Sequence, residues 1–355
     1  MKYLTYISRP GANGSGLTDF FPSLSEYTNS GRVKLCGYRA AKSMEFLYYN
    51  TDIIVIAMYG DYEPEQLDDI MRLSRIRPGQ HVIVPSPLAP PIELPDNVHW
   101  LTFKSMYSIY AKNSKFIEQD RPAIKKHFIS LNHRHMWFRQ ELLYFLKYNN
   151  LLDSTYFSYT GNDRFNEGAR KLFDQADQVI GSSRYTGLNR DDVYDMLPYK
   201  NFVEINPPEN NKQVVDFCNI QDLYNTAAVG IESETYLEKH LDNNPGLTEK
   251  TMRPLMLGNP FLTYSNRGTL KTLREMGFET FGNIIDESYD DIFSPQQRWE
   301  AILDQVTALS KSDPQGLINQ VVDVCKYNQN HMLVTLQNSL EEDDQTIYNL
   351  IRSLL

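Results

Sequence analysis

The chain has 355 residues, of which 41% are hydrophobic and 23% are charged, as is usual for a folded protein of about two domains. Its 17 Phe, 23 Tyr and 3 Trp provide enough apolar surface to exclude disorder over most of the length. Asp and Glu outnumber Lys and Arg by 45 to 35, and the formal net charge of −10 argues against non-specific binding to nucleic acid.

The three cysteines, Cys36, Cys218 and Cys325, lie far apart and form no CxxC pair. This spacing excludes a disulfide scaffold and a zinc knuckle, and it favours a reducing compartment, so we expect a cytoplasmic protein. No run of 18 apolar residues occurs, and we therefore expect no membrane span.

The first half of the chain alternates between short β-rich runs and helical patterns, which is typical of parallel α/β layers. The predicted strands are residues 3–8, 33–37, 53–58, 81–85, 99–103 and 127–131, and the predicted helices are 40–49, 64–75 and 138–149. The run 53–58 is continuously apolar, which indicates a sheet covered on both faces. Four prolines within residues 85–91 predict a surface loop.

The second half repeats this pattern and ends in helices. Its predicted strands are residues 178–180, 202–205, 227–231 and 261–264, and its predicted helices are 221–224, 249–257, 268–276 and 295–310. Asp313-Pro314 predicts the start of a further helix. We therefore expect two α/β domains, residues 1–155 and 156–310, followed by a helical tail over 311–355.

A glycine-rich segment follows the first predicted strand and contains Gly11, Asn13, Gly14 and Gly16. Glycines let a backbone approach a ligand closely, and ligands bind at the carboxyl ends of strands in open α/β sheets. We interpret the segment as a ligand-facing loop, with a flexible surface loop as the alternative. Its spacing is not that of the dinucleotide-binding fingerprint.

Polar and cationic residues gather at the turn between the strand 127–131 and the following helix, where Asn132, Arg134 and Arg139 lie. A cation in the first turn of a helix opposes the helix dipole by ~0.3–1 kcal/mol, a cost that a bound phosphate would offset. The alternative is a set of solvated arginines. His133 and His135 have no third residue at a metal-ligand spacing, so no metal site is predicted.

A third segment begins with an apolar strand that ends in Glu232 and Glu234. Further on, Thr248 is predicted to cap a helix that carries Glu249 and Lys250 in its first turn, and Gly258 is predicted to end it. A helix start with an acid and a lysine suits a nucleoside diphosphate. The alternative is a capped surface helix with an ordinary Glu–Lys pair.

These residues resemble a known family. Glu232, the segment 247–250, the helix and the segment 258–262 resemble the donor-binding region of α1,3-fucosyltransferase-like glycosyltransferases, and the turn from Asn132 to Arg139 is similar to another segment of that family. Residues 277–281 and 286–290 also resemble glycosyltransferase-like proteins of large phages and viruses.

The resemblance implies a GT-B fold, in which two Rossmann-like domains face each other across a cleft. The N-terminal domain would lie on the acceptor side, and the C-terminal domain would bind the nucleotide sugar without a metal. Glu249 would bind the ribose, Lys250 the diphosphate, and Arg139 and Arg134 the phosphates. Glu232 or Glu234 would contact the donor sugar. Gly246 stands where the family often has an aromatic residue, so base stacking is not expected there.

The expected reaction is transfer of a sugar from a nucleotide sugar to a hydroxyl of a glycan, a small molecule or a hydroxymethylated DNA base. No cofactor is expected beyond the donor itself. Asp19 is the candidate general base, with Asp61 and Glu63 as alternatives. A viral origin would place the protein in the host cytoplasm. The alternative function is a non-catalytic nucleotide-sugar-binding or structural protein with the same fold.

Overall fold

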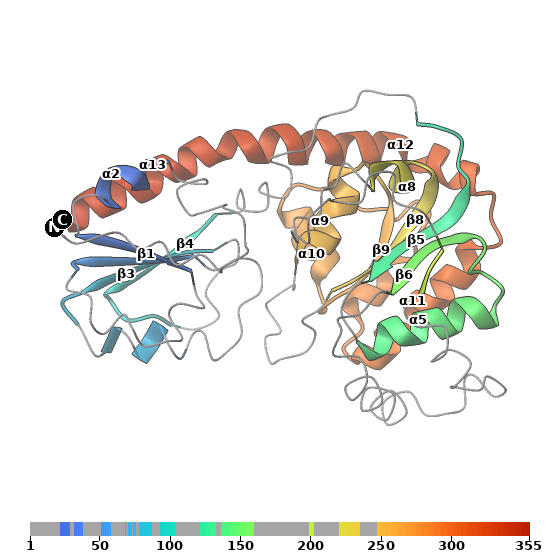
Figure 1. The fold of residues 1–355 in the computed structure, drawn as a ribbon, viewed down its shortest axis with the longest axis horizontal. Coiled ribbons are helices and arrows are strands. Elements are labelled where there is room, and N and C mark those ends of the chain that lie inside the picture. The colour runs from blue at the N-terminus through green and yellow to red at the C-terminus, as the bar shows by residue number, and fades with distance from the viewer. Residues whose placement is uncertain are drawn as a thin grey trace.

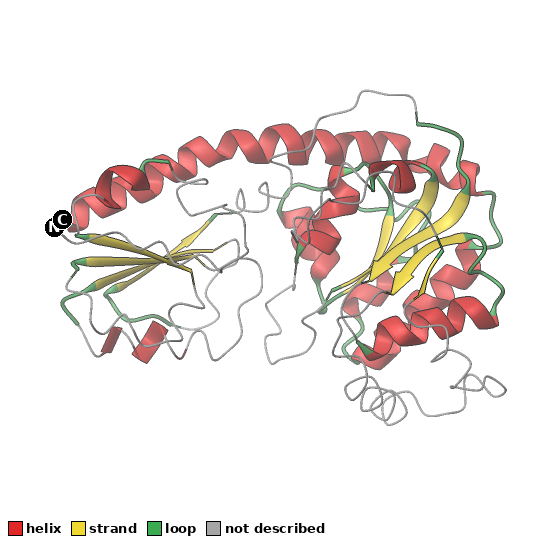
Figure 2. Ribbon diagram, viewed as in Figure 1, coloured by secondary structure: helices red, strands yellow, loops and turns green. Residues whose placement is uncertain are grey.

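A computed structural model describes residues 22–28, 32–37, 51–57, 68, 70–72, 74–75, 78–86, 93–103, 121–132, 136–159, 199–201, 220–234 and 247–355. Within these residues the chain forms two separate β-sheets with helices around them (Figure 2). The predicted α/β class with parallel sheets is therefore confirmed.

The first sheet has the order β1-β2-β3-β4, and every neighbouring pair is parallel. Its strands are β1 (Val33–Gly37), β2 (Ile53–Ala57), β3 (His81–Ser86) and β4 (Val98–Thr102). Ile53 to Ile56 in β2 are all fully buried, so this central strand is covered on both faces as its continuous apolar sequence predicts.

The second sheet has the order β7-β6-β5-β8-β9 and is parallel except for the edge strand β7. Its strands are β5 (Lys126–Asn132), β6 (Thr155–Tyr159), β7 (Tyr199–Lys200), β8 (Ala227–Ser233) and β9 (Phe261–Tyr264). The helices around the two sheets are α2 (Leu24–Thr28), α5 (Trp137–Tyr148), α8 (Gln221–Asn225), α9 (Glu249–Met256), α10 (Thr269–Glu275), the 3₁₀ helix η4 (Glu287–Asp291) and α11 (Pro295–Leu309).

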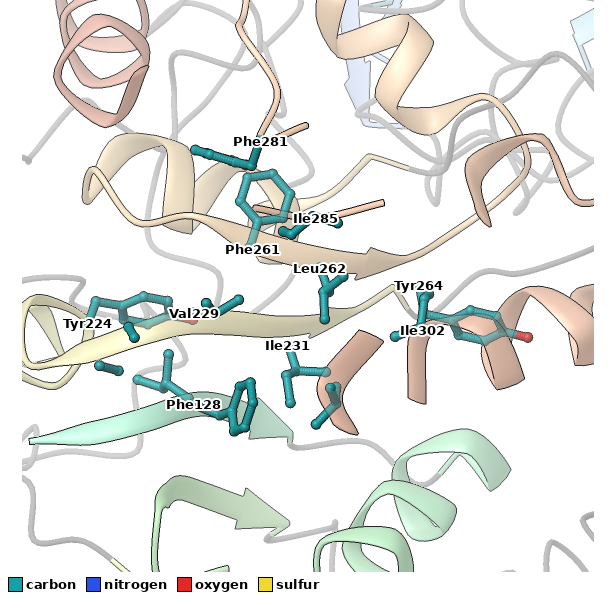
Figure 3. Close-up of a cluster of buried hydrophobic side chains, with 14 of the residues drawn as sticks. Phe128, Tyr224, Val229, Ile231, Phe261, Leu262, Tyr264, Phe281, Ile285 and Ile302 are labelled. Carbon is teal, nitrogen blue, oxygen red and sulfur yellow. The ribbon is translucent and has the colours of Figure 1, made fainter. Parts of the chain in front are cut away.

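Aromatic and branched side chains fill the core of the second sheet (Figure 3). Phe128 of β5, Val229 of β8 and Phe261 of β9 are each at most 2% exposed, and the Phe261 ring meets the Phe281 ring edge-on at 5.5 Å. On the other side of β9, Tyr264 packs against Trp299 of α11. Side chains of the three neighbouring strands thus join α11 and the 278–285 segment in one apolar cluster.

A partly buried arginine holds the amino ends of these strands. Arg121 donates to the carbonyl oxygens of Tyr224, Asn225, Ala227 and Gly258, at 2.8 to 3.1 Å, and also to the Asn259 side chain. Burial lowers the pKa of Arg121 to about 10, so the group stays charged at neutral pH. One guanidinium therefore ties the segment before β5 to the segments before β8 and β9.

The C-terminal helices connect the two sheets. α12 (Pro314–Asn330) passes through a π-helical segment, η5 (His331–Thr335), into α13 (Leu336–Leu354), and Figure 1 shows this long helix extending from the second sheet to the first. Ile347 and Ile351 of α13 are fully buried in the core of the first sheet. In addition, the Asp344 carboxylate accepts hydrogen bonds from the backbone and the hydroxyl of Ser23, the latter at 2.7 Å.

Most predicted elements that fall on described residues are confirmed, and Asp313 caps α12 as expected. The division of the chain differs from the prediction. β5 pairs with β6 and β8, so residues 126–148 belong with the second sheet, and the chain leaves the first sheet before residue 126 rather than near 155. The expected domain boundary at residue 155 falls at the start of β6, a strand that was not predicted. The predicted tail over 311–355 is helical, but α13 completes the first sheet's core.

The strands of both sheets run toward the middle of the molecule (Figure 1). β1 starts beside the C-terminus, where Arg32 donates to the carbonyl of Leu355 at 3.0 Å, and β5 starts beside the beginning of α12, where the His127 ring bonds with the Ser312 carbonyl at 2.9 Å. The carboxyl ends of all the parallel strands therefore face the region between the two sheets.

Ile351→Ala is expected to destabilise the first sheet selectively, because it removes a fully buried side chain between α13 and that sheet. Such truncations cost about 2–5 kcal/mol. Hydrogen-exchange mass spectrometry should show faster exchange in β1 to β3 and unchanged exchange in β5 and β8. The exposed Glu342→Ala on the same helix serves as the control. Equal acceleration in both sheets would contradict the prediction.

Candidate functional site

In the second sheet, the direction in which the chain adds successive strands reverses between β5 and β8. The chain moves from β5 outward to β6, and later from β8 outward to β9 on the other side. In open α/β sheets, ligands bind beyond the carboxyl ends of the strands at this switch point. Here the two strands end in Asn132 and Ser233.

A hydrogen-bond network joins the two strand ends. The Ser233 hydroxyl donates to Asn132 Oδ1 at 3.1 Å, the Asn132 amide donates to the Ser130 hydroxyl at 3.0 Å, and Ser130 donates to the Ile231 carbonyl at 2.6 Å. These polar side chains are all at most 4% exposed. Their bonds to one another fix the carboxyl edge of the sheet at the switch point.

Arg139, in the first turn of α5, also donates hydrogen bonds to this network. Its Nε donates to the Ser233 hydroxyl at 3.0 Å and its Nη2 to the Ser233 carbonyl at 2.5 Å. The side chain is fully buried. The structure therefore places Arg139 at the predicted edge of the sheet, with its guanidinium directed at the end of β8.

Glu234, the residue after β8, anchors the start of α9. Its buried carboxylate accepts from the backbone N–H groups of Thr248 and Thr251, at 3.0 and 3.2 Å, and from both threonine hydroxyls. Four donors thus occupy the two oxygens. The carboxylate positions the helix, whereas a contact with a donor sugar stays a prediction.

Lys250 lies in the first turn of α9, directly beside this carboxylate. Its Nζ is 4.0 Å from Glu234 Oε2 and 3.3 Å from the Thr248 hydroxyl, and 14% of the side chain is exposed. Thr248 caps the helix by accepting from the Lys250 N–H at 3.3 Å, as predicted. At the other end of α9, Gly258 has a φ of 66°, in the left-handed region that a glycine after a helix permits.

Glu232 lies two residues before Glu234 and is buried in a second polar cluster. It accepts from the Tyr224 hydroxyl at 2.5 Å, and that hydroxyl also accepts from Arg253 Nη1 at 3.3 Å. Burial raises the pKa of Glu232 to about 7, although Arg253 and the Tyr224 hydrogen bond favour the charged form. Burial thus favours the neutral form of this carboxyl group more than water does.

The structure brings together the candidates Asn132, Arg139, Glu234, Thr248 and Lys250 at one edge of the second sheet. Glu249 opens α9, but its side chain lies outside the described residues. Also outside them are Arg134, the candidate bases Asp19, Asp61 and Glu63, and the loop residues Gly11, Asn13, Gly14 and Gly16.

Sequence reasoning missed several members of the site. Ser233 connects Asn132 with Arg139, and Thr251 shares the Glu234 carboxylate with Thr248. Thr251 lies three residues after the cap, a spacing that places both threonines on one side of the first helical turn. That spacing is a usable signal. No sequence signal pairs Tyr224 with Glu232, because the pairing depends on how α8 packs on β8.

Among the described residues, no group of three His, Cys, Asp or Glu side chains is placed to hold a metal ion. Within the same residues, no helix is both long and apolar enough to cross a membrane. The chain matches no protein-family model and has no significant match among curated proteins.

Glu234→Gln is expected to destabilise the protein by at least about 1–3 kcal/mol, because a glutamine amide cannot accept from all four donors of Thr248 and Thr251. Thermal unfolding measures the loss. The exposed Glu279→Gln makes the same chemical change at a solvated position and should have almost no effect. Equal stability of the two variants would show that the Glu234 bonds do not hold α9.

Glu232→Gln is expected to change how stability depends on pH. The folded protein keeps a proton on Glu232 up to about pH 7, whereas the unfolded chain releases it near the ordinary value of 4.5. Wild-type stability should therefore fall relative to the variant as pH rises from about 4.5 to 7, and the difference should level off above that range. Urea unfolding at several pH values measures this difference, and a pH-independent difference would contradict the assignment.

Proposed function

We propose that the protein is a glycosyltransferase that moves a sugar from a nucleotide-sugar donor to a hydroxyl acceptor without a metal ion. The observation that carries this proposal is the position of Lys250 and Arg139. In a chain of net charge −10, both cations lie at the switch point of a parallel sheet, Lys250 in the first turn of α9 and Arg139 in the first turn of α5. This combination favours an anionic ligand such as a diphosphate.

The arrangement of the two sheets supports a GT-B fold. Their parallel strands end toward each other, and α13 returns from the second sheet to complete the core of the first (Figure 1). A donor held at the second sheet would present its sugar toward the carboxyl ends of the first sheet. The acceptor would then bind on the side of the first sheet.

Each of these residues would have its own role in the reaction. Lys250 and Arg139 would stabilise the negative charge that develops on the leaving diphosphate, and Glu249 would accept hydrogen bonds from the ribose hydroxyls. Asp19, with Asp61 and Glu63 as alternatives, would remove the proton of the acceptor hydroxyl. The proposed acceptors are a glycan, a small molecule or a hydroxymethylated DNA base, the last in a viral protein acting in the host cytoplasm.

A second candidate is a non-catalytic protein that retains the same fold. The observation that favours it is the internal bonding of the site, since Arg139 is fully buried on Ser233 and the Glu234 carboxylate is occupied by threonines. In this case the cluster would serve stability, and nucleotide sugars would not be turned over.

Lys250→Ala is expected to abolish nucleotide binding with little loss of stability, because the backbone N–H that Thr248 caps is kept and only the Nζ contacts with Thr248 and Glu234 are lost. Thermal unfolding with UDP, GDP, CMP, ADP and dTDP, each with and without Mg²⁺, measures binding. A ligand at ~100 times its Kd adds about 2.7 kcal/mol.

Lys271→Ala is the matched control, because that lysine is 72% exposed and pairs with Glu275 on α10. Release of the nucleotide from the corresponding nucleotide sugar then separates the two candidate functions. Turnover by the wild type and not by Lys250→Ala supports the enzyme. Binding without turnover of any donor supports the non-catalytic protein, and equal turnover by both forms would refute the role of Lys250.

A further inference from the structure

One aromatic ring stands out at the carboxyl edge of the second sheet. Phe293, in the turn between η4 and α11, is 72% exposed, the highest value among the large hydrophobic side chains that the structure describes. An exposed phenyl ring offers a flat apolar surface that a planar ligand can cover. A ring kept in this position is more readily explained if a ligand covers it.

The backbone beneath Phe293 is held firmly. Buried Arg298 donates to the Ile292 carbonyl at 2.6 Å, and the Tyr264 hydroxyl donates to the Pro295 carbonyl at 3.2 Å. The residues on either side of Phe293 are thus fixed by α11 and by the end of β9. Phe293 is presented by a rigid turn, which reduces the entropy lost when a ligand binds.

A cation lies over one side of the ring. The Arg267 guanidinium is 5.5 Å from the centre of the Phe293 ring, a distance typical of a cation–π contact. Arg267 is itself exposed, and this contact is its one recorded interaction within the described part of the chain. An aromatic ring beside a guanidinium is the combination with which proteins commonly stack an unpaired nucleobase.

Phe293 lies at the same carboxyl edge of the sheet as the start of α9, because its partner Arg267 follows β9 and Thr248 is bonded to the residue after β8. Tyr264 ends β9, and its carbonyl accepts from the Glu234 N–H at 2.9 Å, while the Glu234 carboxylate holds Thr248. Arg267 follows Tyr264 by three residues. The Phe293–Arg267 pair therefore lies beyond the end of β9. At the same edge of the sheet, the Thr248–Lys250 turn lies beyond β8 and Arg139 lies beyond β5.

We infer that Phe293 and Arg267 form the base-binding part of the nucleotide site. This inference rests on the proposed function. Phosphates held between Lys250 and Arg139 occupy the β5 side of α9, and the ribose lies at the first helical residue, Glu249. The base then extends toward β9, where the open face of the Phe293 ring stacks on it. The pair supplies the aromatic surface that is absent at Gly246.

Isothermal titration tests the assignment with two kinds of probe, the nucleoside diphosphates UDP, GDP, ADP and dTDP, and inorganic pyrophosphate. Phe293→Ala should weaken binding of the preferred nucleotide about 5- to 100-fold, the range that stacking on an aromatic side chain supplies, and leave pyrophosphate binding unchanged. Phe293→Tyr keeps the stacking surface and should bind like the wild type. Tyr148→Ala removes a 49% exposed ring from the far end of α5 and serves as the control.

The outcomes distinguish this inference from the proposed function. If Lys250→Ala weakens the binding of both probes and Phe293→Ala weakens the binding of neither, the nucleotide site is supported and the base assignment is wrong. If Phe293→Ala weakens the binding of a nucleotide sugar but not of the free nucleotide, the base assignment is also wrong, because the ring would then contact the sugar. If no nucleoside diphosphate binds the wild type, the proposed function and the base assignment both fail.

Discussion

The buried carboxylate of Glu234 is the constraint on which the candidate site depends. A charged group with no exposure must find hydrogen-bond donors inside the protein, and Glu234 finds four of them in Thr248 and Thr251. Those bonds fix the first turn of α9 at the end of β8. Lys250 consequently lies beside the end of β8. Arg139 and Asn132 bind the same strand end through Ser233.

Charged side chains in the second sheet are stabilised differently at the amino ends and at the carboxyl ends of its parallel strands. At the amino edge, Arg121 is surrounded by neutral acceptors, mainly backbone carbonyls, which hold the guanidinium without a carboxylate partner among the described residues. At the carboxyl edge, acids and cations occur together, in Glu234 with Lys250 and in Glu232 with Arg253. At the amino ends the arginine joins backbone segments, whereas at the carboxyl ends acidic and cationic side chains lie side by side.

The sequence predicts local structure well where one segment carries its own signal. The apolar strand 53–58, the Thr248 cap and the Asp313-Pro314 helix start all match the structure, because propensity, burial and capping act over a few residues. The division between the sheets was wrong because strand pairing is not local. β5 follows the first sheet in the chain but pairs with β8, about a hundred residues later.

The candidate site follows the same rule. Lys250 and Arg139 were identified from helix-start patterns that each lie within one segment. The contact that unites them runs through Ser233 and Glu234 and depends on the order of strands in the sheet, which no single segment encodes. Phe293 was missed for a related reason, since an isolated phenylalanine reads as a core residue until its exposure is known.

The position of α13 has a consequence for how the chain matures during synthesis. The described strands of the first sheet lie within residues 33–102, but Ile347 and Ile351 of their core are about 250 residues further along. A ribosome adding about 5–20 residues per second delivers those side chains roughly ten seconds or more after β4. During that interval the strands of the second sheet leave the ribosome and can pair, while the face of the first sheet that α13 will cover stays open to solvent and to chaperones. The N-terminal sheet, although made first, is thus the later of the two to complete its core.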